Sequence, residues 1–217
     1  LFYYQTGKKR DAEKIFKELG ERSTDQIEVV RKVVQLYLDK KKYDETVVIL
    51  QGMLKGAPKS SDLQYVLAVA FDGTKDWEKA IAHFKKVTPD SKFYSEATVH
   101  IAYLYQKHKN TREAIDYLKG VIKNTPNNPE FLLYLGSLYE EEEEFGKAED
   151  VLKKGISIEA DNPGIHFRLG VVYDKWGKKK DSIAQMKTVI SIEPKNANAL
   201  NYLGYTYAEM GENLDEA

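Results

Sequence analysis

The sequence predicts an all-α protein built as an array of antiparallel helix pairs, and three observations support this. The first is self-similarity at a fixed period of 34 residues, clearest in the pattern L-G-x-x-Y at residues 135–139, 169–173 and 203–207. The second is apolar residues at helical spacing, as in residues 27–38. The third is a recurring Asn-Pro pair, at 128–129 and 162–163, which is a strong helix-start signal.

The expected helices follow in order along the chain. Residues 1–5 should end a first helix, Gly7 should turn the chain, and residues 11–19 should form its partner. Pro89 should end the second helix of its pair early, because proline lacks a donor for the helix. The further expected helices are 27–38, 44–54, 63–71, 77–87, 97–107 and 111–122, followed by pairs that start after Asn128 and Asn162.

Three glycines recur at one position of the period, Gly136, Gly170 and Gly204. Glycine inside a helix costs about 1 kcal/mol relative to alanine. Small residues, Ala68 and Ala102, occupy the same position earlier in the chain. The pattern therefore predicts that two helices approach too closely here for a larger side chain.

The repeated pattern resembles the tetratricopeptide repeat (TPR): L-G-x-x-Y, then a small residue, a large apolar residue four further on, and Pro. The resemblance extends over the whole chain, with Ala12, Thr46, Ala80, Ala114, Ala148 and Ser182 in the small position. It implies a right-handed α-solenoid and a fragment of a longer protein. The implied units are a partial 1–26, the whole units 27–60, 61–94, 95–128, 129–162 and 163–196, and a partial 197–217.

Composition excludes several classes of protein. Charged residues make up 31% with a net charge of −1, which indicates a soluble protein without electrostatic preference for nucleic acid or anionic membrane. No apolar stretch approaches the roughly 18 residues that span a bilayer, so membrane insertion is not expected. The absence of cysteine excludes disulfides and thiolate metal sites. The localisation stays open between the cytoplasm and a bacterial periplasm or envelope.

No residue pattern indicates catalysis. The four histidines form no metal-binding motif, no nucleophile motif surrounds a serine, and no glycine-rich loop could hold phosphate. The sequence therefore predicts no catalytic residue, no cofactor and no metal site.

The acidic run 140–144 has two interpretations. It can end a helix and pair with the basic run 178–180 of the next unit, because stacked units bring successive turns side by side. A calcium site is the alternative, but it would need a loop with alternating oxygen ligands.

The TPR resemblance also implies a binding surface, because the first helix of each unit lines the concave face in that family. The fifth and ninth residues of each unit would then point into the groove. The residues expected to bind are Arg31, Gln35, Tyr65, Val69, Val99, Tyr103, Leu133, Phe167, Val171 and Tyr205. Asp72, Glu130, Glu140 and Asp174 would give the strip an acidic rim. Exposed apolar surface usually marks a binding site, although successive first helices could instead bury these residues against each other.

A protein or peptide partner in this groove is the leading functional hypothesis. Family members that clamp an acidic C-terminal tail use Lys and Asn, and only Arg31 and Gln35 come near that pattern, so such a tail is disfavoured. A spacer or assembly element of a multi-protein complex, and the regulatory arm of an enzyme, are the alternatives. Both ends cut through a helix pair, which predicts self-association through uncapped ends.

Overall fold

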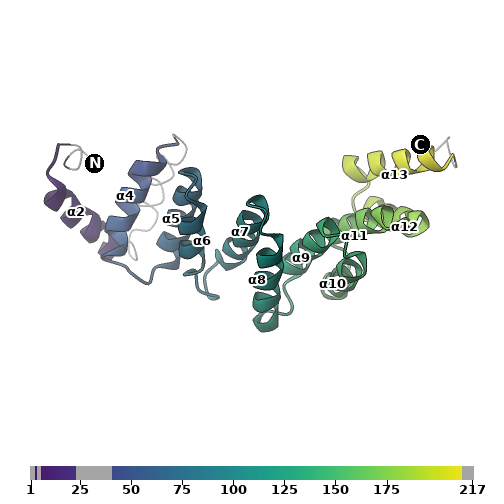
Figure 1. Ribbon diagram of the computed structural model, residues 1–217, viewed down its shortest axis with the longest axis horizontal. Helices are drawn as coiled ribbons and strands as arrows, with labels where there is room; N and C mark the ends of the chain where they lie inside the picture. Colours follow the sequence, from purple (N-terminus) through teal and green to yellow (C-terminus); the bar gives the residue numbers. More distant parts are fainter. Residues whose placement is uncertain (1–2, 4–5, 23–40, 212–217) are drawn as a thin grey trace. The chain divides into compact units, whose positions relative to one another are not determined.

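The computed structural model describes residues 3, 6–22 and 41–211, and within these ranges it contains eleven helices and no strand (Figure 1). The predicted all-α class is confirmed. The helices are α2 (Lys9–Glu21), α4 (Tyr43–Leu54), α5 (Ser61–Gly73), α6 (Trp77–Phe84), α7 (Tyr94–Lys107), α8 (Thr111–Asn124), α9 (Pro129–Glu141), α10 (Phe145–Ile158), α11 (Pro163–Lys175), α12 (Lys179–Ile192) and α13 (Ala197–Met210). The expected helix 27–38, with Arg31 and Gln35, lies outside the described residues.

The chain divides into two compact units, Leu1–Leu104 and Tyr105–Ala217. In the first, α4 packs against α2 and α5, and α5 packs against α6. In the second, each helix from α8 to α12 packs against the one that follows it. Each unit is thus a stack of antiparallel helix pairs, the predicted α-solenoid arrangement.

The helix starts repeat with the period of the sequence. The second helices of the pairs, α2, α4, α6, α8, α10 and α12, begin at Lys9, Tyr43, Trp77, Thr111, Phe145 and Lys179, always 34 residues apart. The first helices α9, α11 and α13 begin at Pro129, Pro163 and Ala197, also 34 residues apart. The assignment of individual unit boundaries stays a prediction.

One turn geometry precedes each of the described second helices. A residue with positive φ lies two positions before each second-helix start, at Gly7, Lys41, Lys75, Lys109, Glu143 and Gly177. The next residue donates its backbone N–H to the carbonyl five positions earlier, for example from Glu144 to Tyr139 at 2.8 Å. This is the Schellman bond that ends a helix at a left-handed residue. Glycine usually fills that position, and here lysine and glutamate also occupy it.

Asparagine side chains start the first helices, as predicted. Asn128 Oδ1 accepts from the backbone N–H groups of Glu130 and Phe131 at 3.0 and 3.3 Å. Asn162 Oδ1 accepts from the Ile165 N–H at 3.1 Å. These bonds satisfy donors that the first turn of a helix leaves free.

The helix α6 ends at Phe84, three residues earlier than the expected Val87. The Val87 N–H instead bonds to the Phe84 carbonyl in a tighter turn, 3.0 Å long. Pro89 follows two residues later, and the residue before a proline is biased away from helical geometry. The predicted early end of this helix is confirmed, and it comes sooner than expected.

The core lies between the paired helices, where small residues allow close packing. The small-position residues Ala80, Ala114, Ala148 and Ser182 are fully buried. A Cβ atom on Gly136 would lie 2.6 Å from Leu152 Cγ, and one on Gly170 would lie 2.6 Å from Met186 Cε. The predicted close approach of helices at these two glycines is therefore confirmed.

Candidate functional site

The first unit carries four of the predicted binding residues on α5 and α7. Tyr65, Val69 and Val99 are half-buried, and Tyr103 is 42% exposed. We call these four residues the first-helix surface of the first unit. None of them is buried as a core residue, so their outer parts remain open to solvent.

The second unit carries the other four described residues, on α9, α11 and α13. Leu133, Phe167 and Val171 are half-buried, and Tyr205 is 65% exposed. They form the first-helix surface of the second unit. Phe167 and Val171 also pack against a core cluster of Met186, Val189 and Ala199. These two therefore hold helices together as well as lining the surface.

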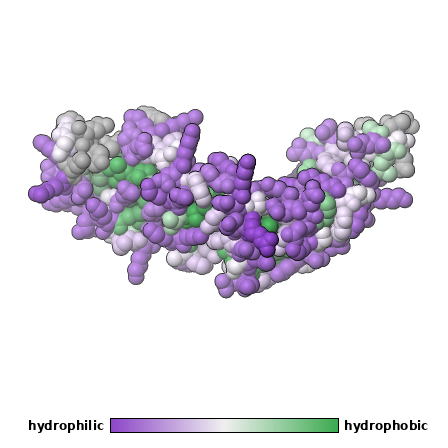
Figure 2. All heavy atoms as spheres, viewed as in Figure 1, coloured by the Kyte–Doolittle hydropathy of each residue, from purple (hydrophilic) through white to green (hydrophobic). Residues whose placement is uncertain are grey.

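On the face seen in Figure 2, hydrophobic residues form separate patches within a mostly hydrophilic surface. Such patches are expected where one part of a side chain packs between helices and another part faces solvent. Patches of this kind are common sites of protein interaction when aromatic residues contribute to them.

A row of five rings links the helices of the first unit. Tyr65 stacks on Phe93 with ring centroids 4.5 Å apart and contacts Phe84 edge-on at 5.6 Å. Phe84 lies 4.8 Å from His100, and His100 lies 5.8 Å from Tyr103. We call these residues the aromatic row. Sequence reasoning missed Phe93 and His100, which lie outside the fifth and ninth positions.

Tyr65 is held in this row by burial and by a carboxylate. Burial raises the pKa of the Tyr65 hydroxyl, and the nearby Glu96 carboxylate, to which it hydrogen-bonds, raises that pKa further. Both effects favour the neutral phenol, so Tyr65 acts as a hydrogen-bond donor and a packing surface.

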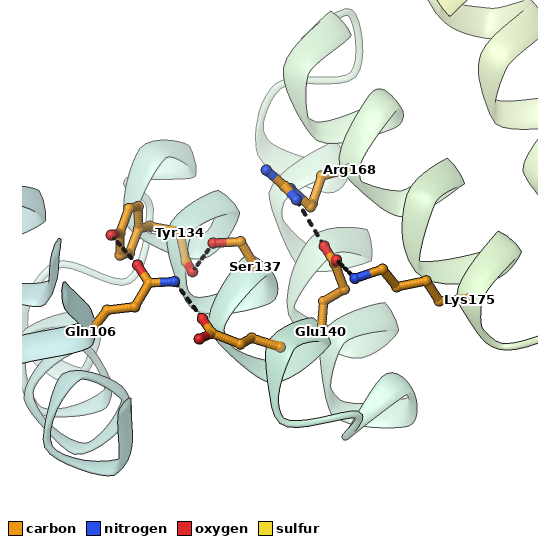
Figure 3. Close-up of polar contacts among 7 residues, drawn as sticks. Gln106, Tyr134, Ser137, Glu140, Arg168 and Lys175 are labelled. Atoms are coloured by element: carbon orange, nitrogen blue, oxygen red, sulfur yellow. Dashed lines mark hydrogen bonds and ion pairs between the residues drawn. The ribbon is translucent and has the colours of Figure 1, made fainter. Parts of the chain in front are cut away.

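A polar ladder joins each first helix to the next one along the chain. A residue in the last turns of one helix contacts a residue 28 positions later, near the start of the next first helix. In the first unit the pair is Asp72 with His100, at 3.1 Å. In the second unit the pairs are Gln106–Tyr134 (2.7 Å), Glu140–Arg168 (2.8 Å) and Asp174–Tyr202 (2.6 Å), the first two shown in Figure 3.

Glu140 is the most buried acid of this ladder, with only 7% of its side chain exposed. Its two oxygens meet Arg168 Nη1 at 2.8 Å and Lys175 Nζ at 2.7 Å (Figure 3). The expectation that Glu140 forms an exposed acidic rim is therefore wrong. Its charge serves to connect α9 to α11, because a carboxylate buried this deeply needs close cations.

The ion pairs of the acidic run also differ from the expectation. Lys178 pairs with Glu149 at 3.6 Å, and Lys179 pairs with Asp174 and Glu209 at 2.5 and 2.8 Å. Glu144 pairs with Lys147 in its own helix turn. The expected pairing of the runs 140–144 and 178–180 is replaced by these contacts in the described residues. The basic run 178–180 therefore lies beside the first turns of α10 and near the end of α13.

Tyr202 offers a test of the ladder by pH. Burial, then the Asp174 carboxylate, raises the pKa of the Tyr202 hydroxyl well above its ordinary value of 10. We expect Tyr202→Phe to lower the free energy of unfolding by about 1–2 kcal/mol at neutral pH, because it removes a hydrogen bond to a charged group. Since the folded pKa lies above the unfolded one, this stabilisation is present below pH 10 and is lost as pH rises beyond it.

The measurement is urea unfolding of both proteins at neutral and at strongly alkaline pH. The gap between them should shrink as the pH rises. A gap that stays constant across this range would contradict the role given to Tyr202.

The described residues contain no group of three His, Asp or Glu side chains arranged to hold a metal ion. Within the same ranges, no helix is both long and apolar enough to cross a membrane.

Comparison with known proteins gives matches along the whole chain. A family model described as the ARM repeat of tetratricopeptide repeat protein 21 matches residues 3–119. Three models described as tetratricopeptide repeats match residues 105–166, 163–196 and 186–217. No curated protein matches the sequence.

Several solved structures are similar in fold. The pilF protein of Pseudomonas aeruginosa is 18% identical with a TM-score of 0.64, covering 96% of this chain and 88% of that one. A MamA fragment from Desulfovibrio magneticus RS-1 is 18% identical with a TM-score of 0.60, covering 78% and 96%. YrrB, described as a TPR protein with an unusual peptide-binding site, is 14% identical with a TM-score of 0.58, covering 78% and 87%. At these identities the likeness concerns the fold alone.

Proposed function

Because the chain belongs to the tetratricopeptide repeat family, we propose that it is a non-catalytic scaffold that binds a segment of a partner protein on its first-helix surfaces. Repeat proteins of this architecture present extended surfaces that suit such binding. YrrB supports the proposal as a protein of similar fold that is described as having a peptide-binding site.

The observation that carries the proposal is the incomplete burial of the predicted binding residues. All eight described members are half-buried or exposed, and the two tyrosines at the ninth position, Tyr103 and Tyr205, are 42% and 65% exposed. A tyrosine held at a surface offers a large apolar ring and a hydroxyl to a partner. Aromatic residues of this kind lead among the hot spots of protein interfaces.

The titratable side chains of these surfaces support a binding role over catalysis. Asp72, Glu140 and Asp174 each contact a residue of the next first helix, so their carboxylates are used to hold neighbouring helices. Tyr65 and Tyr202 stay protonated because burial and a nearby carboxylate raise their pKa. None of these groups is arranged as a nucleophile beside a base.

Affinity capture with two exposed tyrosines replaced tests the proposal. The structure favours Tyr103→Ala/Tyr205→Ala, because Phe167 also packs against the core and its loss would disturb folding. Each hot-spot truncation costs about 2 kcal/mol, so we expect the double variant to bind its partner at least tenfold more weakly. The measurement is the amount and affinity of the protein captured from a native lysate.

Trp176→Ala is the matched control, because Trp176 is an exposed aromatic residue at the C-terminal end of α11, outside the first-helix surfaces. It should capture the same partner as the unchanged chain. A partner that Tyr103→Ala/Tyr205→Ala retains at full affinity would contradict the proposed site. Binding would then be assigned to the edges of the array, as an assembly element requires.

A further inference from the structure

We propose that the first-helix surface of the first unit binds a basic segment of the partner, in which two Arg or Lys side chains flank apolar residues. This inference rests on the scaffold function proposed above and specifies the chemistry of what it binds. It concerns α5 and α7 of the first unit alone.

A carboxylate lies at each end of this surface. Glu96, in the first turn of α7, interacts with the hydroxyl of Tyr65 near the start of α5. Asp72, in the last turn of α5, lies 3.1 Å from His100 Nε2. Tyr65 and Asp72 are seven residues apart, which is about 10 Å along a helix that rises 1.5 Å per residue. The two acids therefore mark the ends of a short surface.

Apolar and aromatic side chains fill the space between these ends. Val69 and Val99 are half-buried, and Tyr103, 42% exposed, lies beside His100. The aromatic row already holds one cation: Lys92 Nζ lies 5.0 Å from the ring centroid of Phe93, which stacks on Tyr65. Aromatic faces attract Arg and Lys side chains, so this row adds a second attraction to that of the acids.

The second unit differs because its own cations meet the acids at the positions equivalent to Asp72. Glu140 pairs with Arg168 and Lys175, and Asp174 pairs with Lys179. Asp72 instead meets the imidazole of His100. Its carboxylate is a quarter exposed, and among the described residues it has no guanidinium or ammonium partner like those of its counterparts, so a cation from another protein can supply one.

The rise of about 10 Å along α5 from Tyr65, which Glu96 contacts, to Asp72 sets the pattern of the partner segment. A polyproline-II segment rises about 3.1 Å per residue with three residues per turn, so basic residues three positions apart lie on the same face and span about 9 Å. A segment of the form basic-apolar-apolar-basic would therefore place one cation near each acid. Exposed ion pairs each contribute little, so the two charges together should change affinity roughly tenfold.

A peptide series tests this inference on the whole 217-residue chain. The probe is a fluorescent hexapeptide, Gly-Arg-Val-Ile-Arg-Gly, with both ends blocked, and its binding is followed by fluorescence anisotropy. Two further peptides carry Gln or Glu in place of both arginines. We expect the basic peptide to bind about tenfold more tightly than the Gln peptide, and the Glu peptide to bind most weakly. Raising the salt concentration should reduce the difference.

Variants of the chain assign the effect to the proposed acids. Asp72→Asn/Glu96→Gln should weaken the basic peptide about tenfold and leave the Gln peptide unchanged. Glu113→Gln is the matched control, because Glu113 is an exposed acid in the first turn of α8, a second helix outside the first-helix surfaces. It should leave binding of the basic peptide unchanged. Circular dichroism shows that the variants keep their helices.

Three results would overturn the inference: equal affinity for the three peptides, no effect of Asp72→Asn/Glu96→Gln, or no binding of the basic peptide at about 1 mM. The capture experiment separates this failure from failure of the scaffold function. A partner lost from Tyr103→Ala/Tyr205→Ala would keep the scaffold function and remove only the basic specificity. A partner retained by that variant would contradict the scaffold site itself.

Discussion

Replacing both Arg168 and Lys175 with methionine is expected to lower the free energy of unfolding by about 3 kcal/mol, because it leaves the buried Glu140 carboxylate without a cation. The Glu140 side chain is only 7% exposed, whereas those of Arg168 and Lys175 are 38% and 53% exposed. The cost therefore falls on the carboxylate, which keeps its charge but loses both partners. Methionine retains most of the apolar stem of each replaced side chain, so packing changes little.

A third substitution separates this electrostatic cost from lost packing. Adding Glu140→Leu to Arg168→Met/Lys175→Met removes the isolated charge, and we expect more than half of the lost free energy to return. Lys147→Met is the control, because Lys147 pairs with Glu144 at an exposed position, and the substitution should leave the free energy of unfolding nearly unchanged. Urea unfolding of all variants gives the values. A triple variant no more stable than the double one would contradict the role of Glu140.

The sequence predicted the fold well because the repeat depends on local signals. The Asn caps at 128 and 162 act through neighbouring residues, and Gly136 and Gly170 act through the second helix of their own pair. These features and the 34-residue spacing appear in the structure where expected. The early end of α6 was also predicted in kind from Pro89 alone. The residue at which α6 ends was not predicted, because the final residues of a helix depend on which turn the following chain adopts.

The polar contacts between units were harder to predict. The partners in the ladder are 28 residues apart, and the pairs mix an acid with His, Arg or Tyr, and a Gln with Tyr. What recurs is therefore the position of the contact, and the residue types at that position differ between repeats. Aligning the units places the acids Asp72, Glu140 and Asp174 at the same position. Only the structure shows that Glu140 and Asp174 pair with Arg or Lys side chains, whereas Asp72 meets His100. The exposure of the predicted binding residues was also hard to predict, because it depends on how neighbouring helices pack.

Replacing Gly136 with alanine is expected to lower the free energy of unfolding by about 2 kcal/mol, despite the better helix propensity of alanine. The new Cβ would lie 2.6 and 2.7 Å from two branch atoms of Leu152, a fully buried side chain. Leu152 branches close to its own backbone, so α9 and α10 must separate to relieve the contact. Chemical unfolding of the variant beside the unchanged chain measures the loss.

Gly170→Ala provides the matched comparison, because Gly170 occupies the same position one repeat later and is also buried. Its new Cβ would meet Met186 Cε at 2.6 Å, the terminal atom of an unbranched side chain that can change rotamer, and Gln185 Cβ at 3.3 Å, which requires only a shift of a few tenths of an ångström. Relief is therefore cheap, and the gain of about 1 kcal/mol in helix propensity should nearly cancel it. Gly170→Ala should thus change stability by less than about 1 kcal/mol. Equal losses at both glycines would show that the distance between helix backbones, and not the flexibility of the facing side chain, decides which repeats require glycine.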